Sequence, residues 1–517
     1  MIAPFQPRAA RPDSLSPATA RGLPGGWIPT ALIAWLGIDQ LLLWRFLDVV
    51  PAWGYALGAT LLVILCHFTL RSGRNHAGPT PATLLCCITV ALALLTLGGE
   101  GRFLYANADW QVRFAVLRDL HINPWPYVYQ VGASAELLRA PIGMFLLPAA
   151  LAKAVGPSVA DIALLVQNAL LLGMLLALGS TLFDSRRARL VALAVFIGFS
   201  GLDIIGRNLF REGLSDHLEN WAYLQYSSTL TLIFWVPQHA LSGWIGAVGF
   251  LLWRSDRLPL STWLTLMPLT ALWSPLGLIG ALPFAALAGW RSLTGRRLVR
   301  ADIALPAAAT LLSLPSLAYL AAGAGEGVGL HVEGLLPLQW ALFELLEVLV
   351  YVVPLVLLVR QGRFGGDTLL IVTLCLLCIP FIRIGWSTDF MMRASITALA
   401  ILAILVADAL LTVPRARLWL VPPLLIGTVT GWYEVRRAFA HPPAPQLRCS
   451  LVRAWDFEAL ELGIRKPGDP PSPKGTYLAP LANVPAIVRP HAPKPARMDD
   501  PPRCWDGHWY YPAAQTD

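Results

Sequence analysis

Long apolar segments recur along most of this 517-residue chain, and they leave few folds open to it. A helix needs about 20 apolar residues to cross the hydrocarbon core of a bilayer. Because backbone polar groups in that core must be satisfied within the protein, the sequence predicts an all-α polytopic membrane protein of about thirteen transmembrane helices. The segments lie near residues 27–49, 52–70, 81–98, 159–183, 188–206, 229–253, 259–273, 275–291, 302–323, 338–360, 367–385, 392–413 and 415–433.

The composition supports a membrane protein over a soluble one. Hydrophobic residues make up 56% of the chain and charged residues 14%, with a mean hydropathy of +0.59, whereas soluble domains contain about 25% charged residues. The net charge of +8 comes mainly from arginines in the connectors between apolar segments. We therefore expect membrane lipids as partners and no nucleic acid.

The distribution of arginine also predicts an orientation. With the N-terminus in the cytoplasm and the thirteen segments threaded alternately, every basic connector falls on the cytoplasmic side, as the positive-inside rule requires. A further apolar run, 140–156, would break this pattern if it crossed the membrane, so it is interpreted as an interfacial or re-entrant helix. The C-terminus is then extracytoplasmic, and the expected location is a bacterial inner membrane. The basic connectors are 71–75, 183–189, 253–257, 290–300, 360–363 and 414–417.

Three regions follow from this topology. Residues 1–26 are rich in Pro, Arg and Ala and are predicted to be a disordered cytoplasmic tail. Residues 27–433 form the transmembrane domain, with an outer loop at 99–158 and a second one at 207–228. Residues 434–517 form a small, Pro-rich extracytoplasmic segment, whose Cys449 and Cys504 could pair if it is exported.

The outer loop 99–158 holds the first candidate for chemistry. Residues 108–122 predict a short helix that lies flat in the membrane interface, with apolar residues on one face and charges on the other. Asp109 begins this helix and could act as a general base toward an acceptor hydroxyl. It could equally be an acid that stabilises the helix N-terminus, by about 0.3–1 kcal/mol. Asp119, further along, is interpreted as a solvated charge.

Two more groups of polar residues lie near the predicted outer face. Asp203 ends a span, and His217 and Glu219 follow it in the second outer loop. They could bind a divalent metal such as Mg²⁺ or Mn²⁺, or simply form the polar face of a surface helix. His239 lies inside the span 229–253, where an ionisable group is a functional candidate unless a neighbouring carbonyl satisfies its neutral form.

Arginines also occur where the orientation rule does not require them. Arg383 and Arg393 lie at the outer ends of two late spans, and Asp389 precedes Arg393 by one helical turn. Guanidinium groups at a membrane boundary suit a lipid-borne phosphate, which they bind in a bidentate manner. The alternative is a structural Asp389–Arg393 ion pair at the start of a helix.

In this arrangement the chain resembles the polytopic glycosyltransferases of the GT-C fold, which use polyprenyl-phosphate-linked sugars. The resemblance rests on Asp109 in the first large outer loop, the interfacial stretch Pro141-Ile-Gly-Met-Phe-Leu-Leu-Pro148 and the turn Ala154-Val-Gly156. The next matching feature is a span that ends in Leu182-Phe-Asp-Ser-Arg-Arg187. The last is the acidic position Asp203, which follows the next span. It covers roughly residues 95–210. Two departures are that Trp110 follows Asp109, where the family often has a second acid, and that two additional spans precede the loop.

The resemblance implies an inverting transferase that moves a sugar from a lipid-linked donor to a glycan, lipid or protein acceptor. Asp109 would be the base, and Arg393 with Arg383 would bind the donor phosphate. The remaining candidates, Asp203, His217, Glu219, His239 and Asp389, would line the pocket or contact the acceptor. Some family members need a divalent metal and others do not. The alternatives are a transporter or flippase for a lipid-linked or anionic envelope precursor, or a non-catalytic protein of envelope assembly.

Overall fold

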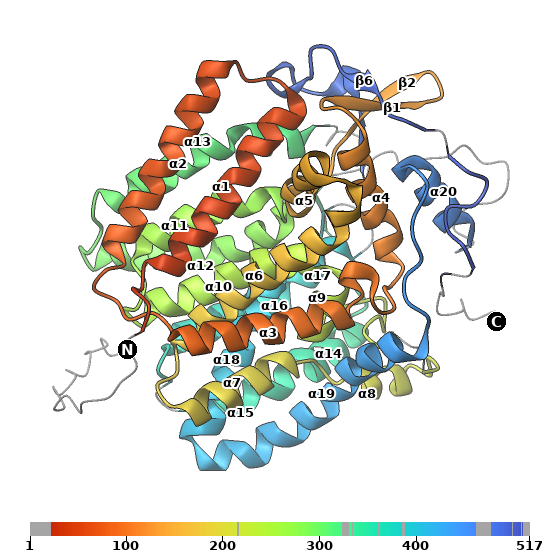
Figure 1. Ribbon diagram of the computed structural model, residues 1–517. Coiled ribbons are helices and arrows are strands. Elements are labelled where there is room, and N and C mark those ends of the chain that lie inside the picture. Colours follow the sequence, from red (N-terminus) through yellow and green to blue (C-terminus); the bar gives the residue numbers. More distant parts are fainter. Residues whose placement is uncertain are drawn as a thin grey trace.

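The computed structural model describes most of the chain and shows a bundle of helices that run along a common direction (Figure 1). The predicted N-terminal tail lies largely outside the described residues. The structure describes residues 22–214, 217–322, 330–332, 334–359, 362–384, 388–461, 477–498, 500–507 and 509.

Twenty α-helices are present in the described residues. The first ten are α1 (Trp27–Leu47), α2 (Ala52–Ser72), α3 (Pro81–Leu97), α4 (Asp109–Ile122), α5 (Gly143–Val155), α6 (Ala160–Ser180), α7 (Arg186–Ile197), α8 (Asp203–Leu209), α9 (Thr229–Trp235) and α10 (Pro237–Arg254). The others are α11 (Leu260–Leu269), α12 (Pro275–Thr294), α13 (Ala301–Ala321), α14 (Pro337–Glu344), α15 (Val350–Leu358), α16 (Gly366–Cys378), α17 (Asp389–Ala394), α18 (Ile396–Thr412), α19 (Pro414–Ala440) and α20 (Leu451–Glu461).

Six stretches of helix in the described residues are long and apolar enough to cross a membrane, and further apolar helices are shorter. The chain is therefore a multi-pass helical membrane protein. The long ones are Trp27–Leu47, Ala52–Ser72, Pro157–Ser180, Pro275–Thr294, Ala301–Ala321 and Pro337–Leu358.

Several predicted spans are apolar as expected but are not continuous helices. The span 229–253 breaks at Val236 into α9 and α10, because Pro237 has no N–H to donate to the preceding turn. The span 188–206 is helical only to Ile197 in α7, and α8 begins at Asp203. Within 338–360, a π-helical turn spans Leu345–Leu349. Hydropathy measures how apolar a segment is, and it does not detect such breaks.

Two small sheets correct the all-α expectation. In the loop after α4, the strands β1 (Tyr127–Val131) and β2 (Ser134–Leu138) form an antiparallel hairpin. The tail strands β5 (Leu478–Pro480) and β6 (Lys494–Pro495) add to its two edges, in the order β5-β2-β1-β6. The second sheet pairs β3 (Leu330–Val332) with β4 (Ile382–Ile384). Both sheets lie in segments that were predicted as loops or span ends.

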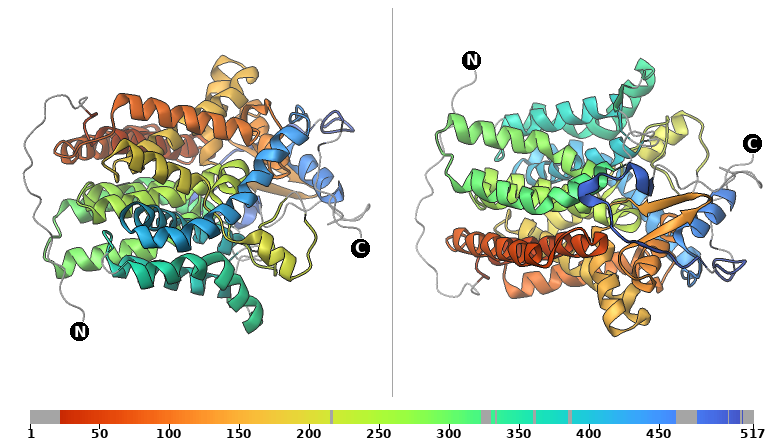
Figure 2. Two further views of the ribbon diagram at one scale, coloured as in Figure 1. Left: turned by 90° about the horizontal axis from the view of Figure 1, so that it is seen from below. Right: turned by 90° about the horizontal axis from the view of Figure 1, so that it is seen from above.

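The two ends of the bundle are built from different elements, and the sheet strands lie at one of them (Figure 2). One end, called the basic end below, carries arginine connectors that are tied together by ion pairs such as Arg257–Asp184 at 2.8 Å and Arg254–Asp367 at 2.7 Å. The opposite end, called the loop end, carries α4, the four-stranded sheet and the C-terminal tail. The gathering of the basic connectors at one end agrees with the alternate threading of the segments.

The C-terminal tail packs against the outer loop and is held there by hydrogen bonds. Cys449 and Cys504 form a disulfide, as the sequence allowed. The Trp509 indole donates a hydrogen bond to the Ala106 carbonyl at 2.8 Å, and the Arg497 amide donates to Asn123 Oδ1 at 2.8 Å. The tail and residues 99–140 therefore form one structural unit over the loop end.

Candidate active site

The break between α9 and α10 provides the anchor for the start of α4. It leaves the carbonyls of Phe234 and Trp235 without partners in their own helix, and a free carbonyl inside a protein needs a donor. Asn107 Nδ2 and Trp110 Nε1 both donate to the Phe234 carbonyl, each at 2.8 Å. The Arg113 guanidinium donates to the Trp235 carbonyl. The position of Asp109 is thus set by three neighbouring side chains bound to one helix break.

The Asp109 carboxylate combines accessibility with a fixed orientation. Arg113 Nη2 lies 2.8 Å from Asp109 Oδ2, one helical turn away. The Arg113 side chain is only 4% exposed, whereas that of Asp109 is 42% exposed. One carboxylate oxygen is therefore held by a buried cation while the group as a whole stays open to a ligand, and a general base must be reachable in this way.

The structure brings Arg393 to the same site. Arg393 lies on α17, where Asp389 Oδ1 accepts an ion-paired hydrogen bond from its Nη1 at 2.7 Å, as the structural interpretation predicted. The charge of Asp109 also acts on Arg393, so the two lie within electrostatic range although 284 positions separate them. Arg383 is exposed on β4, which packs next to α17.

His239 lies behind this site. It is in the first turn of α10, fully enclosed, and within range of the charges of both Arg393 and Arg113. Its Nδ1 and the Oε1 of neighbouring Gln238 have no hydrogen-bond partner in the described part of the chain. The sequence left open a neutral His239 that is satisfied by a neighbouring carbonyl. The described residues show no such hydrogen bond.

A second group of carboxylates gathers beside α8. The buried Asp203 begins this helix, and its Oδ2 accepts hydrogen bonds from Ser200 Oγ and Thr430 Oγ1, each at 2.8 Å. The carboxyl group of Glu347, in the π-helical turn, lies close by. A Cβ on Gly201 would come within 1.7 Å of Glu347 Oε2, so only glycine permits this approach. Asp203 is thus held in a closed polar pocket.

His217 and Glu219 belong to this second group, which we call the acidic cluster (Asp203, His217, Glu219, Glu347 and Glu434). His217 Nδ1 lies 3.1 Å from Glu434 Oε1 on α19. Glu219 Oε1 accepts a hydrogen bond from the Ser228 amide at 2.8 Å. Both side chains connect the second outer loop to helices of the bundle, so the surface-helix interpretation of this loop is wrong.

Burial changes the proton affinities of these loop residues. It raises the pKa of Glu219 to about 7, against the opposing attraction of His217. Burial disfavours the charged form of His217, but the hydrogen bond and charge of Glu434 outweigh this and raise the pKa of His217 above its usual value. The contact with Glu434 therefore favours the protonated form of His217.

Trp235 connects the two groups. Its backbone carbonyl accepts from Arg113, while its indole Nε1 donates to Glu434 Oε2 at 2.9 Å. The His217 ring lies with its centroid 4.8 Å from that of Trp235. The two groups share this residue but differ in access, because Asp109 is half-exposed and Asp203 is buried.

A divalent metal was one of two possibilities that the sequence left open at Asp203, His217 and Glu219. Among the described residues, no three His, Cys, Asp or Glu side chains are grouped in a way that could hold a metal ion. The carboxylates of the acidic cluster are engaged by hydroxyl, amide, indole and imidazole groups instead. We derive no step through a metal.

The surroundings of α4 show that protein covers both its apolar and its charged face. Nearly every side chain from Trp110 to Leu120 is buried, because α5, α6 and the C-terminal tail cover the helix. Asp119 is fully buried rather than solvated. Its Oδ2 accepts from the Leu451 amide and from the Tyr129 hydroxyl, both at 2.7 Å, and burial raises its pKa to about 6. Asp119 therefore anchors α20 to the outer loop.

Sequence reasoning missed several participants. Glu347 lies within the apolar segment 338–360, and the rule that flagged His239, that an ionisable group in a span is a functional candidate, would have flagged it too. Arg113 was seen only as a charge on the polar face of α4. Tyr477 of the tail, whose charge state influences Arg393, could not have been found, because no local pattern links the tail to α17.

Comparison of this chain with protein-family models, with curated proteins and with solved structures finds no match.

Proposed function

We propose that this protein is a GT-C-type membrane glycosyltransferase with about thirteen spans, which transfers a sugar from a polyprenyl-phosphate donor to an acceptor hydroxyl. The observation that carries the proposal is the half-exposed Asp109 carboxylate, held by the buried Arg113 and within range of Arg393. A base and a phosphate-binding cation are the two groups that such a transfer requires. They come from segments far apart in the sequence.

In the proposed reaction, Asp109 takes the proton of the acceptor hydroxyl as its oxygen attacks the anomeric carbon. The bond from that carbon to the phosphate oxygen breaks, and the configuration at the carbon inverts. The bonding electrons leave with the polyprenyl phosphate, whose growing negative charge is stabilised by Arg393, with Arg383 nearby. Gln238 and His239 lie buried behind this site and support it from the first turn of α10.

The proposal places this chemistry on the extracytoplasmic side. Two features support that orientation. The arginine connectors gather at the opposite end of the bundle, as expected of the cytoplasmic side. The Cys449–Cys504 disulfide belongs to the loop end, and disulfides persist in oxidising compartments outside the cytoplasm.

A deletion strain tests the proposal. Its lipids and envelope glycans would be extracted and compared by mass spectrometry after complementation with the wild-type chain, Asp109→Asn or Asp184→Asn. Asp184 is an exposed carboxylate at the basic end and serves as the matched control. We expect the wild type and the control to restore a missing glycan and consume a lipid-linked sugar, whereas Asp109→Asn should do neither. Full restoration by Asp109→Asn would remove Asp109 from the role of base.

A transporter would give a different result. Vesicles that contain the purified chain would then move a solute or a lipid-linked precursor across the membrane without consuming the sugar donor. That outcome would overturn the proposed transfer.

A further inference from the structure

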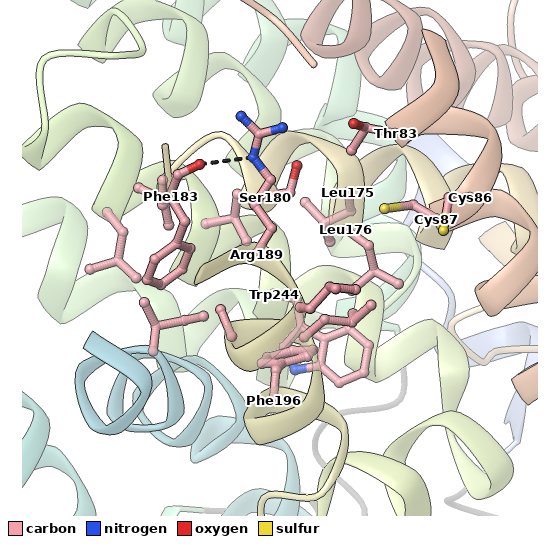
Figure 3. A pocket seen from close by; sticks show the side chains of 18 of the residues that line it. Thr83, Cys86, Cys87, Leu175, Leu176, Ser180, Phe183, Arg189, Phe196 and Trp244 are labelled. Carbon is pink, nitrogen blue, oxygen red and sulfur yellow. Dashed lines mark hydrogen bonds between the residues drawn. The ribbon is translucent and has the colours of Figure 1, made fainter. Parts of the chain in front are cut away.

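A cavity in the described residues lies away from Asp109, toward the basic end. It encloses about 530 Å³ between α3, α6, α7, α10 and α18, and its walls are almost entirely apolar. Figure 3 shows Arg189, Ser180 and Thr83 toward one end of the cavity and Phe196 with Trp244 toward the other. The cavity is therefore apolar along its length and polar at one end.

The cavity opens on the side of the bundle. Cys86 of α3 and Leu190 of α7 both line it, and both are exposed on the surface of the protein. In a membrane protein, such an opening between apolar helices faces hydrocarbon. An apolar cavity of this size is not stabilised by water, so a hydrocarbon chain is the occupant that its chemistry suits.

The polar end carries an excess of positive charge. Arg186 and Arg189 line the cavity at the first turn of α7, and no acidic residue lies in that turn. The helix dipole adds its own positive end at this point. Within the part of the chain that the structure describes, no carboxylate forms an ion pair with either arginine, whereas Arg257, Arg254 and Arg363 at the same end are each paired with an aspartate.

The geometry of Arg189 leaves donors for a ligand. Its Nε donates to the Phe183 carbonyl at 2.9 Å, and its Nη2 donates to the Asp184 carbonyl at 3.2 Å. These bonds fix the guanidinium at the cavity end and leave other N–H groups of its five available. A guanidinium held in this way is suited to a phosphate oxygen.

We propose that this cavity is a binding site for an anionic phospholipid from the membrane leaflet beside the basic end. An acyl chain fills the space down to Phe196 and Trp244, and the phosphate binds Arg186 and Arg189. Burial of the acyl chain in the cavity stabilises it little more than the surrounding bilayer does, because both environments are apolar. The arginines therefore determine which headgroup is retained. This site is independent of the proposed glycosyltransferase activity.

The test measures lipid retention by the full-length protein. The chain would be reconstituted in nanodiscs that contain equal amounts of phosphatidylglycerol and phosphatidylcholine with identical acyl chains. It would then be extracted in mild detergent, and the retained lipid would be counted by native mass spectrometry. We expect phosphatidylglycerol to be enriched over phosphatidylcholine, and the double variant Arg186→Gln/Arg189→Gln to lose about ten-fold in that enrichment, as for one or two charge-assisted hydrogen bonds.

Two further variants make the result specific. Arg187→Gln removes the same charge from an exposed residue of α7 that does not line the cavity, and it should leave retention unchanged. Leu193→Trp fills the cavity and should reduce the retention of both lipids. Equal retention of the two lipids by the wild type would overturn the proposal. So would an equal loss in Arg187→Gln and in the double variant, or full retention in a folded Leu193→Trp protein.

Discussion

Asp109 and Asp203 lie at the same end of the bundle and share Trp235 as a neighbour, yet their surroundings differ. Asp109 is held by one buried arginine and remains 42% exposed, whereas Asp203 is enclosed and receives hydrogen bonds from two hydroxyl groups. A group that exchanges a proton with a substrate must be reachable. We therefore propose chemistry at Asp109 and support of the helices by the acidic cluster, and variants of the two sites should behave differently.

The largest expected effect is on transfer by Asp109→Asn. The amide keeps the shape of the side chain but cannot accept the proton, so the rate should fall by about 10²–10⁴-fold. Asp203→Asn should reduce it by less than about ten-fold, because the amide can still accept from Ser200 and Thr430. Transfer from a polyprenyl-phosphate sugar to acceptor would be measured in proteoliposomes. Equal losses in the two variants would abolish the distinction between the sites.

Arg393→Gln should have the next largest effect on transfer. Loss of a cation at the departing phosphate is expected to lower kcat by about 10²–10³-fold. Arg393→Lys should recover part of this, since it keeps the charge but not the bidentate geometry. Arg437→Gln, next to the acidic cluster, serves as the comparison, because Arg437 forms an ion pair with Glu434. An undiminished kcat in Arg393→Gln would leave the Asp389–Arg393 pair a purely structural role.

Removal of the disulfide should loosen the helix that carries Asp109 more than the helix that carries Asp203. Replacing Cys449 and Cys504 by serine removes a cross-link between residues 55 apart, which is worth about 2–4 kcal/mol. The tail covers α4, so hydrogen exchange should increase in α4 and α20 and change little in α8. Uniform loosening of all three helices would contradict the separation of the two regions.

Substitution of Asp119 by asparagine should have the smallest effect, which is a pH-dependent change in the stability of the tail's attachment. Its pKa in the folded protein is raised to about 6, above the usual 3.9 of an unfolded chain. The stability that this group contributes is thus full below about pH 4 and is lost as the pH rises through 6, by on the order of 1–3 kcal/mol. Protease release of the tail, compared between wild type and Asp119→Asn at pH 4 and pH 7, measures this. A difference independent of pH would contradict the raised pKa.

The sequence predicted the membrane class, the grouping of basic connectors at one end and the candidate site residues near the other. These depend on composition and on alternation along the chain, which are local properties. It did not predict that α4 is buried, because the covering residues come from α5, α6 and a tail more than 300 positions later. It also missed the break at Val236 and therefore the anchoring of Asp109. The break follows from Pro237, a local signal that hydropathy does not weigh, whereas the burial and the anchoring depend on partners that only the fold brings together.

The claim on which the rest depends is that Asp109 faces the extracytoplasmic side and the basic end faces the cytoplasm. It can be tested in intact cells with a membrane-impermeant thiol reagent. Single cysteines would be placed at exposed Phe103 and Gln130 of the outer loop and at exposed Arg187 of the basic end, in a background whose five free cysteines are serine. The account predicts labelling of the first two in intact cells and of the third only after permeabilisation. Labelling of Arg187→Cys but not of Phe103→Cys or Gln130→Cys in intact cells would contradict it.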